Sequence, residues 1–190
     1  MKRAVMMAAI CGLLIGGIAG AFGHLAWPLL PKRNQTAVIP EHPVWTEVEW
    51  PFATDEWGRG KAFRCAAAHC GADVNLYIRA KIGFCNCTTG VADDDELQRL
   101  SDLRLMGNKP SALGPGREIS VRWMKGRSRA YVTSDRPRST ALAIAFNDRC
   151  DAVVATVVTA RDRPDIIEPS AIAFLNSDKI IQWATDTLGL

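Results

Sequence analysis

The hydrophobic positions of the chain form one uncharged N-terminal run, followed by shorter segments with strand-like or helix-like spacing. Residues 4–31 contain no Asp, Glu, Lys or Arg. An apolar stretch of about 20 residues makes roughly 30 Å of helix, which is enough to cross a bilayer. Residues 1–27 are therefore predicted to be a single-pass transmembrane anchor, with residues 4–27 in the membrane. The alternative is a cleaved secretory signal, because small residues around Gly20 are typical of a cleavage site.

Small residues recur every four positions in this segment and lie on one stripe of a helix. The stripe consists of Ala8, Gly12, Gly16 and Gly20. This spacing lets two membrane helices approach closely and indicates a homodimer contact; the alternative is the general Ala and Gly content of signal segments. Lys2 and Arg3 precede the run and favour a cytoplasmic N-terminus. The rest of the chain is then expected outside the cytoplasm: on the periplasmic side in a bacterium, or secreted if the segment is cleaved.

Residues 28–43 separate this segment from the rest of the chain. They contain four prolines and show no helical period, which predicts an extended linker. Beyond the linker, residues 44–190 carry the patterns expected of one extracytoplasmic domain.

Alternation of apolar and polar residues predicts most of the strands in this domain. Residues 74–79 alternate strictly, so a strand is expected from 74 to 84. Residues 140–146 and 152–159 are almost continuously apolar, as in central strands that are buried on both faces. Their short connection predicts antiparallel pairing. The remaining predicted strands are 44–52, 61–65, 118–124 and 129–133, with a turn at 125–127 between the last two.

Helical spacing follows the acidic residues 93–96 and recurs at the C-terminus. Acidic side chains in a first turn complement the free N–H groups of a helix, and this interpretation is favoured over a calcium loop. A last helix is expected between Ser177 and Gly189. The predicted fold class is α+β: an antiparallel sheet of about five to seven strands with helices packed against it.

Composition and charge exclude some classes of function. The formal net charge of the 190 residues is +3, and it falls to +1 without Lys2 and Arg3. A general nucleic-acid surface therefore has no support. The one local concentration of positive charge comprises Lys125, Arg127 and Arg129. It is a candidate docking site for an acidic envelope protein or lipid headgroups, with a solvated turn as the alternative.

Cysteines supply the most distinctive chemistry of the domain. An exported domain is expected to form disulfides, and the candidates are Cys65, Cys70, Cys85, Cys87 and Cys150. Five cysteines cannot all pair internally, so one is left over. Cys65 and Cys70 are close enough for a small loop, whereas Cys150 is the long-range partner for Cys85 or Cys87. That long-range bridge is expected to stabilise the fold by about 4 kcal/mol.

A metal or thiol site is the alternative use of the same residues. Soft ligands for Cu or Zn are offered by Cys65, His69, Cys70, Cys85 and Cys87. Their C-x4-C and C-x-C spacings are not standard for zinc, and no cofactor is otherwise implied. The chain also lacks a phosphate-binding glycine loop, G-x-S-x-G and H-E-x-x-H. The sequence thus favours a non-enzymatic accessory or interaction module over a thiol- or metal-handling envelope protein.

Overall fold

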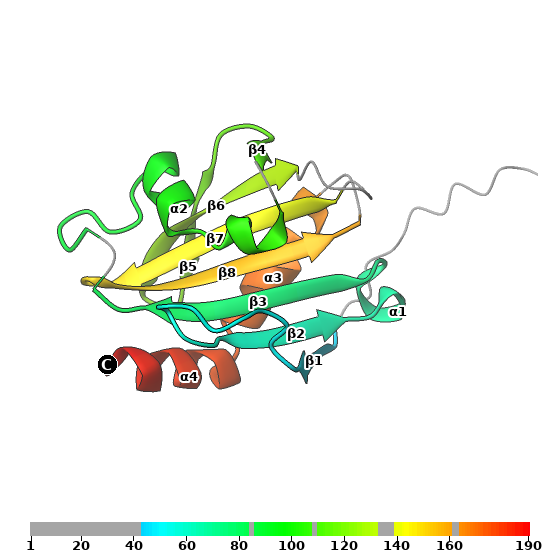
Figure 1. Ribbon diagram of the computed structural model, residues 1–190, viewed down its shortest axis with the longest axis horizontal. Helices are drawn as coiled ribbons and strands as arrows, with labels where there is room; N and C mark the ends of the chain where they lie inside the picture. The colour runs from blue at the N-terminus through cyan, green and yellow to red at the C-terminus, as the bar shows by residue number, and fades with distance from the viewer. Residues whose placement is uncertain (1–42, 84–85, 108–109, 133–138, 161–163) are drawn as a thin grey trace, which may run out of the picture. The chain divides into compact units, whose positions relative to one another are not determined.

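The computed structural model describes residues 43–190 apart from 84–85, 108–109, 133–138 and 161–163 (Figure 1). Within this part, an eight-stranded antiparallel sheet has the order β1-β2-β3-β8-β7-β6-β4, and β5 also pairs with β6. The strands are β1 Trp45–Val48, β2 Lys61–Cys65, β3 Val74–Lys81, β4 Ser111–Ala112, β5 Arg117–Val121, β6 Met124–Val132, β7 Thr140–Asp148 and β8 Asp151–Thr159. The helices are α1 Ala67–Cys70, α2 Asp94–Leu100, α3 Glu168–Leu175 and α4 Asp178–Leu188, with short 3-10 turns η1 Leu103–Met106 and η2 Pro164–Ile166. The α+β class is confirmed.

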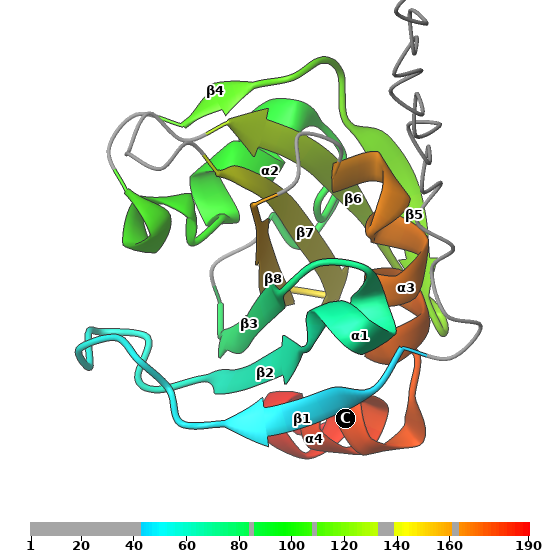
Figure 2. The same cartoon turned by 90° about the vertical axis from the view of Figure 1, so that its right-hand side faces the viewer.

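Strands β7 and β8 lie in the middle of the sheet and separate two hydrophobic cores. Leu142, Ile144 and Phe146 of β7 pack in the core that contains α3 and α4. The alternate positions of β7 are alanines, and they pack with Leu97 and Leu100 of α2. Figure 2 shows α2 and α3 on opposite sides of the sheet. The continuous apolar runs therefore do mark strands that are covered on both faces.

The sheet has one strand more than the upper bound of the prediction. The additional strand is β4, whose two residues lie in a loop with no alternating pattern and pair with Tyr131 and Val132. A two-residue strand leaves no period-2 signal, so only its partner reveals it.

The turn predicted at residues 125–127 is wrong, because β6 runs through this segment. The hairpin turns at Arg122 and Trp123 instead, where Val121 pairs with Met124. A Cβ atom on Gly126 would lie 2.0 Å from the carbonyl oxygen of Ala145. Gly126 is thus required for the close approach of β6 to β7 and not for a turn.

The helix termini follow the sequence closely. Asp93 precedes α2, and its side chain accepts a hydrogen bond of 2.8 Å from the backbone N–H of Glu96. Helix α4 begins after Ser177 and ends at Leu188, and its C-cap residue Gly189 adopts a left-handed φ of 68°. The acidic run therefore starts a helix, as predicted.

The predicted anchor 1–27, its small-residue stripe and residues 28–42 of the linker lie outside the described residues. In the part of the chain that the structure describes, no helix has the length and apolar character needed to cross a membrane.

Candidate binding cleft

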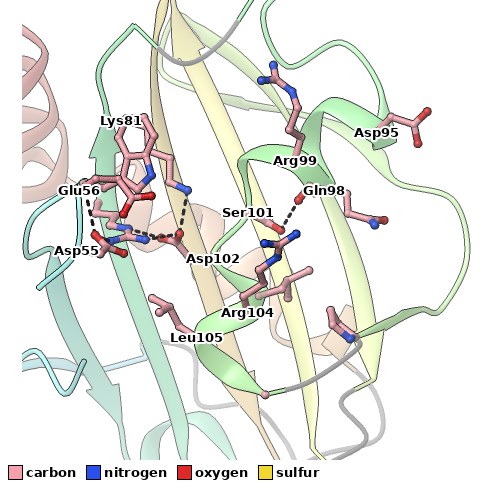
Figure 3. Close-up of a pocket in the computed structure, with 15 residues that line it drawn as sticks. Asp55, Glu56, Lys81, Asp95, Gln98, Arg99, Ser101, Asp102, Arg104 and Leu105 are labelled. Carbon is pink, nitrogen blue, oxygen red and sulfur yellow. Dashed lines mark hydrogen bonds and ion pairs between the residues drawn. The ribbon is translucent and has the colours of Figure 1, made fainter. Parts of the chain in front are cut away.

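A cavity of about 980 Å³ opens on the side of the sheet that carries α2 (Figure 3). One wall is formed by α2 and η1, and the opposite wall by residues 55–57 of the β1–β2 loop. Arg79 and Lys81 of β3 line the floor. We call this space, lined by α2, η1, residues 55–57 and the two cations of β3, the charged cleft. Its volume falls in the range of sites that bind small molecules or short segments of a partner.

The floor of the charged cleft is a buried ion-pair cluster. The side chains of Arg79, Lys81 and Asp102 are only 5%, 5% and 6% exposed. Arg79 donates from Nε and Nη2 to the two carboxylate oxygens of Asp102, each at 2.6 Å. The Nζ atom of Lys81 lies 2.9 Å from Oδ1 of Asp102 and donates to the carbonyl oxygen of Leu100 at 2.7 Å. Burial of these charges is tolerable because each has a close, hydrogen-bonded partner.

A second carboxylate reaches the same cluster from the β1–β2 loop. Nη1 of Arg79 donates to Oδ1 of Asp55 at 2.7 Å, and the backbone N–H of Trp57 donates to the same atom at 3.0 Å. The hydrogen bond from Arg79 lowers the pKa of Asp55. Burial alone lowers the pKa of Arg79, but its hydrogen bonds to Asp102 and Asp55 outweigh this and raise that pKa overall. Asp55 differs from Asp102 in being 31% exposed.

Aromatic side chains fix the loop wall against β3. Trp50 and Phe52 pack edge-on against Tyr77, with ring centroids 6.1 and 4.9 Å away. Trp57 lies beside Lys81, whose Nζ is 5.4 Å from the indole centroid. A Cβ atom on Gly60 would lie 2.3 Å from the carbonyl oxygen of Ile78, so glycine permits the loop to return close to β3. The cleft therefore has one aromatic side chain, that of Trp57, in its loop wall, and the other rings hold this loop against β3.

The α2 wall is held by Asp94 in the first turn of the helix. Its Oδ1 lies 2.8 Å from Nη2 of Arg127, and its Oδ2 accepts from the backbone N–H of Gly116 at 2.9 Å. Arg129 is more distant, at 3.6 Å. The hydrogen bond from Gly116, followed by that from Arg127, lowers the pKa of Asp94. These contacts tie α2 to β6 and to the residue that precedes β5.

Replacement of Asp94 by asparagine is expected to destabilise the domain by about 1 kcal/mol at neutral pH, since a charged hydrogen-bond acceptor is lost. The folded-state pKa of Asp94 is below the unfolded value of about 3.9. The stabilisation is therefore present above that value and disappears as the pH falls through the lowered pKa. Urea denaturation of both proteins at pH 7 and pH 3 measures the effect, and the difference should shrink at the lower pH. Asp95→Asn, one position along the same turn, is the control; an equal loss in it would contradict the assignment.

Other charged residues line the rim. Arg99 of α2 pairs with Glu96, and its Nε donates to that carboxylate at 3.1 Å. Arg104 of η1 is exposed and has no hydrogen bond or ion pair with the residues that the structure describes. Glu56 on the loop wall and Gln98 on α2 also line the opening. Both signs of charge are thus presented to a ligand.

The structure forms two disulfides, Cys65–Cys70 and Cys87–Cys150. Cys85 lies outside the described residues. In the sheet register, Cys65 of β2 lies opposite Val74, at the first residue of β3. Cys150 follows β7, at the opposite end of the sheet. Seven residues of strand separate the two ends by about 23 Å.

The soft ligands predicted for Cu or Zn are consequently not brought together. Cys65, His69 and Cys70 lie at one end of the sheet and Cys87 at the other. Among the described residues, no group of three or more His, Cys, Asp or Glu side chains is arranged to hold a metal ion. Both predicted cysteine segments instead supply sulfur atoms to disulfides.

The basic docking candidates lie side by side along β6. Arg127 and Arg129 contact Asp94, and Nε of Arg129 also donates to the carbonyl oxygen of Gly114 at 2.7 Å. Lys125 is exposed. Docking to an acidic partner through these three residues stays a prediction, with two of the charges already engaged within the domain.

The ion-pair cluster was missed by the sequence analysis, although one signal was available. Arg79 and Lys81 occupy alternate positions on the polar side of a strand. If helices cover both faces of the sheet, this polar side is buried and its cations require carboxylate partners. The positions of Asp55 and Asp102 in the sequence do not indicate that these two residues are the carboxylate partners.

The chain has little similarity to known proteins. No protein-family model and no curated protein matches the chain. Among solved structures, the chain is similar to a protein of unknown function, PA94 from Pseudomonas aeruginosa. The match has a TM-score of 0.44 and 13% identity, and covers 72% of this chain and 95% of that one. At this level, the likeness carries no argument about function.

Proposed function

We propose that the domain is an extracytoplasmic interaction module that binds its partner in the charged cleft and is held at the membrane by residues 1–27. The two disulfides support an oxidising location, because cytosolic reductants keep most thiols reduced. The uncharged N-terminal run supports the membrane tether, with secretion as the outcome if the run is cleaved.

The observation that carries the proposal is the position of the buried ion-pair cluster at the floor of an open cavity. Buried ion pairs contribute little net stability, and apolar residues of similar volume often serve a core equally well. Arg79, Lys81 and Asp102 border the cavity and present fixed charges next to the indole of Trp57. Such a combination of oriented charges and an adjacent aromatic side chain is suited to recognition.

A matched pair of glutamines allows the proposal to be tested in the full-length chain. Gln98 on α2 and Gln182 on α4 are both exposed, and they lie on helices that cover opposite faces of the sheet. A photoreactive residue at position 98, in the native membrane, is expected to crosslink to a defined partner. The same residue at position 182 is expected to give no such product.

A second substitution distinguishes the charged cleft from the outer surface of α2. Trp57→Ala changes the opposite wall, so it should reduce the crosslink formed from position 98. Equal crosslinking from positions 98 and 182, or a position-98 product unaffected by Trp57→Ala, would overturn the proposal.

A further inference from the structure

We infer that the charged cleft binds an oxyanion, a carboxylate or phosphate group at one end of a larger ligand, and that Asp55 occupies the place of this group in the free protein. The inference rests on the proposed function and specifies the ligand chemistry of the same cleft.

The buried side chains at the floor of the cleft carry unequal numbers of positive and negative charges. Two buried cations, Arg79 and Lys81, share one buried carboxylate, that of Asp102. These three side chains together carry one excess positive charge. Asp55 is the second anion that approaches the cluster, and its carboxylate contacts Arg79 at 2.7 Å. Asp55 supplies the negative charge that balances this excess, so an oxyanion that displaces Asp55 keeps the floor neutral.

The two carboxylates that contact Arg79 differ in burial and in their number of hydrogen bonds. Asp102 is 6% exposed and is held by two hydrogen bonds from Arg79 and by Lys81. Asp55 is 31% exposed, belongs to the β1–β2 loop and receives one hydrogen bond from Arg79. Its remaining contact, with the backbone N–H of Trp57, lies within the same loop. Asp55 is thus the partner that can be exchanged without exposing a buried carboxylate.

Hydrogen-bond donors surround the position of the Asp55 carboxylate, and an incoming oxyanion would meet the same donors. When Asp55 moves aside, the hydrogen bonds that it accepts from Nη1 of Arg79 and from the backbone N–H of Trp57 are released, and among the described residues Nη1 keeps only its 3.4 Å contact with the carbonyl oxygen of Gly58. Lys81 lines the same cavity. Charge-assisted hydrogen bonds from guanidinium and ammonium groups are strong with carboxylate and phosphate oxygens. The cavity of about 980 Å³ is much larger than one oxyanion, so the group is one end of a larger molecule.

The rim limits the charge of that molecule. Arg104 favours the entry of an anion, the charge of Arg99 is balanced by Glu96, and Glu56 and Asp95 oppose a second negative charge. The cleft is therefore suited to a ligand with one anionic end and not to a polyanion.

The test uses the full-length protein in detergent, titrated with inorganic phosphate or with acetate at constant ionic strength and monitored through backbone amide resonances. Saturable shifts are expected at Trp57 and Lys81. Asp55→Asn removes the internal competitor and should tighten binding about tenfold. Glu56→Gln removes the same charge from the adjacent position, which has no contact with Arg79, and should change binding less than about threefold. Lys81→Met should weaken binding at least tenfold.

The two substitutions of the loop separate displacement of Asp55 from a general effect of charge. Equal effects of Asp55→Asn and Glu56→Gln would overturn the inference, as would the absence of saturable shifts in both wild type and Asp55→Asn. Because Lys81→Met can unfold the domain, the decisive comparison is between the two loop variants. Binding of phosphate, acetate or both supports the oxyanion site and identifies its chemical source. Crosslinking from position 98 without binding of either anion rejects the oxyanion and retains the cleft as the partner site.

Discussion

Replacement of Asp102 by alanine is expected to lower the free energy of unfolding by about 3–5 kcal/mol. Asp102 is the only buried carboxylate that contacts Arg79 and Lys81 among the described residues, and all three side chains are 5–6% exposed. Its removal leaves two cations desolvated with Asp55 as the remaining anionic partner. Urea denaturation monitored by circular dichroism measures the loss, and urea is chosen because it does not screen charge.

Two further proteins test whether charge is the cause. Asp73→Ala removes a carboxylate whose ion pair with Arg64 is 57% exposed on each side, so it should cost less than about 1 kcal/mol. A triple variant with Arg79→Met, Lys81→Met and Asp102→Leu replaces the whole cluster by apolar side chains and should recover most of the stability. A triple variant as unstable as Asp102→Ala would show that packing, not unpaired charge, is responsible.

The sequence allowed the centre of the fold to be predicted more reliably than its edges. Strands β7 and β8 are continuously apolar because both of their faces are covered, and this pattern is independent of any distant contact. The β5–β6 turn depends on a contact that the sequence does not display, since Gly126 is needed where β6 approaches Ala145. In the sequence, Gly126 lies between Lys125 and Arg127, and a glycine in such polar surroundings is typical of a turn.

The charged cleft could not be predicted for a related reason. The alternation of β3 indicates that Arg79 and Lys81 point to the same side, but not that α2 covers that side. Asp102 directly follows α2 and its C-cap residue, and Asp55 belongs to a loop. Their meeting with Arg79 depends on the three-dimensional placement of three separate segments. Spacing indicated the Cys65–Cys70 loop and a long-range role for Cys150, but it did not distinguish Cys87 from Cys85 as the partner of Cys150.

The Cys87–Cys150 disulfide is expected to stabilise the domain more than Cys65–Cys70. The two cysteines are separated by 63 positions in the first case and by five in the second. In the chain-entropy model, a disulfide lowers the conformational entropy of the unfolded state, and this loss of entropy rises with the length of the loop that the disulfide closes. Replacement of both Cys87 and Cys150 by serine should therefore cost about 4 kcal/mol, and replacement of Cys65 and Cys70 about 2 kcal/mol.

Urea denaturation of the two double variants under non-reducing conditions provides the comparison, and reduction of the wild-type protein gives the combined effect. Cys87 of the long-range bridge lies shortly before α2 in the chain, and α2 forms a wall of the charged cleft. Its loss should consequently weaken crosslinking from position 98, whereas loss of Cys65–Cys70, at the opposite end of the sheet, should leave it unchanged. Equal losses of stability in the two variants would contradict the loop-length explanation. An unchanged crosslink without Cys87–Cys150 would show that the contacts of Asp94 are sufficient to hold the wall.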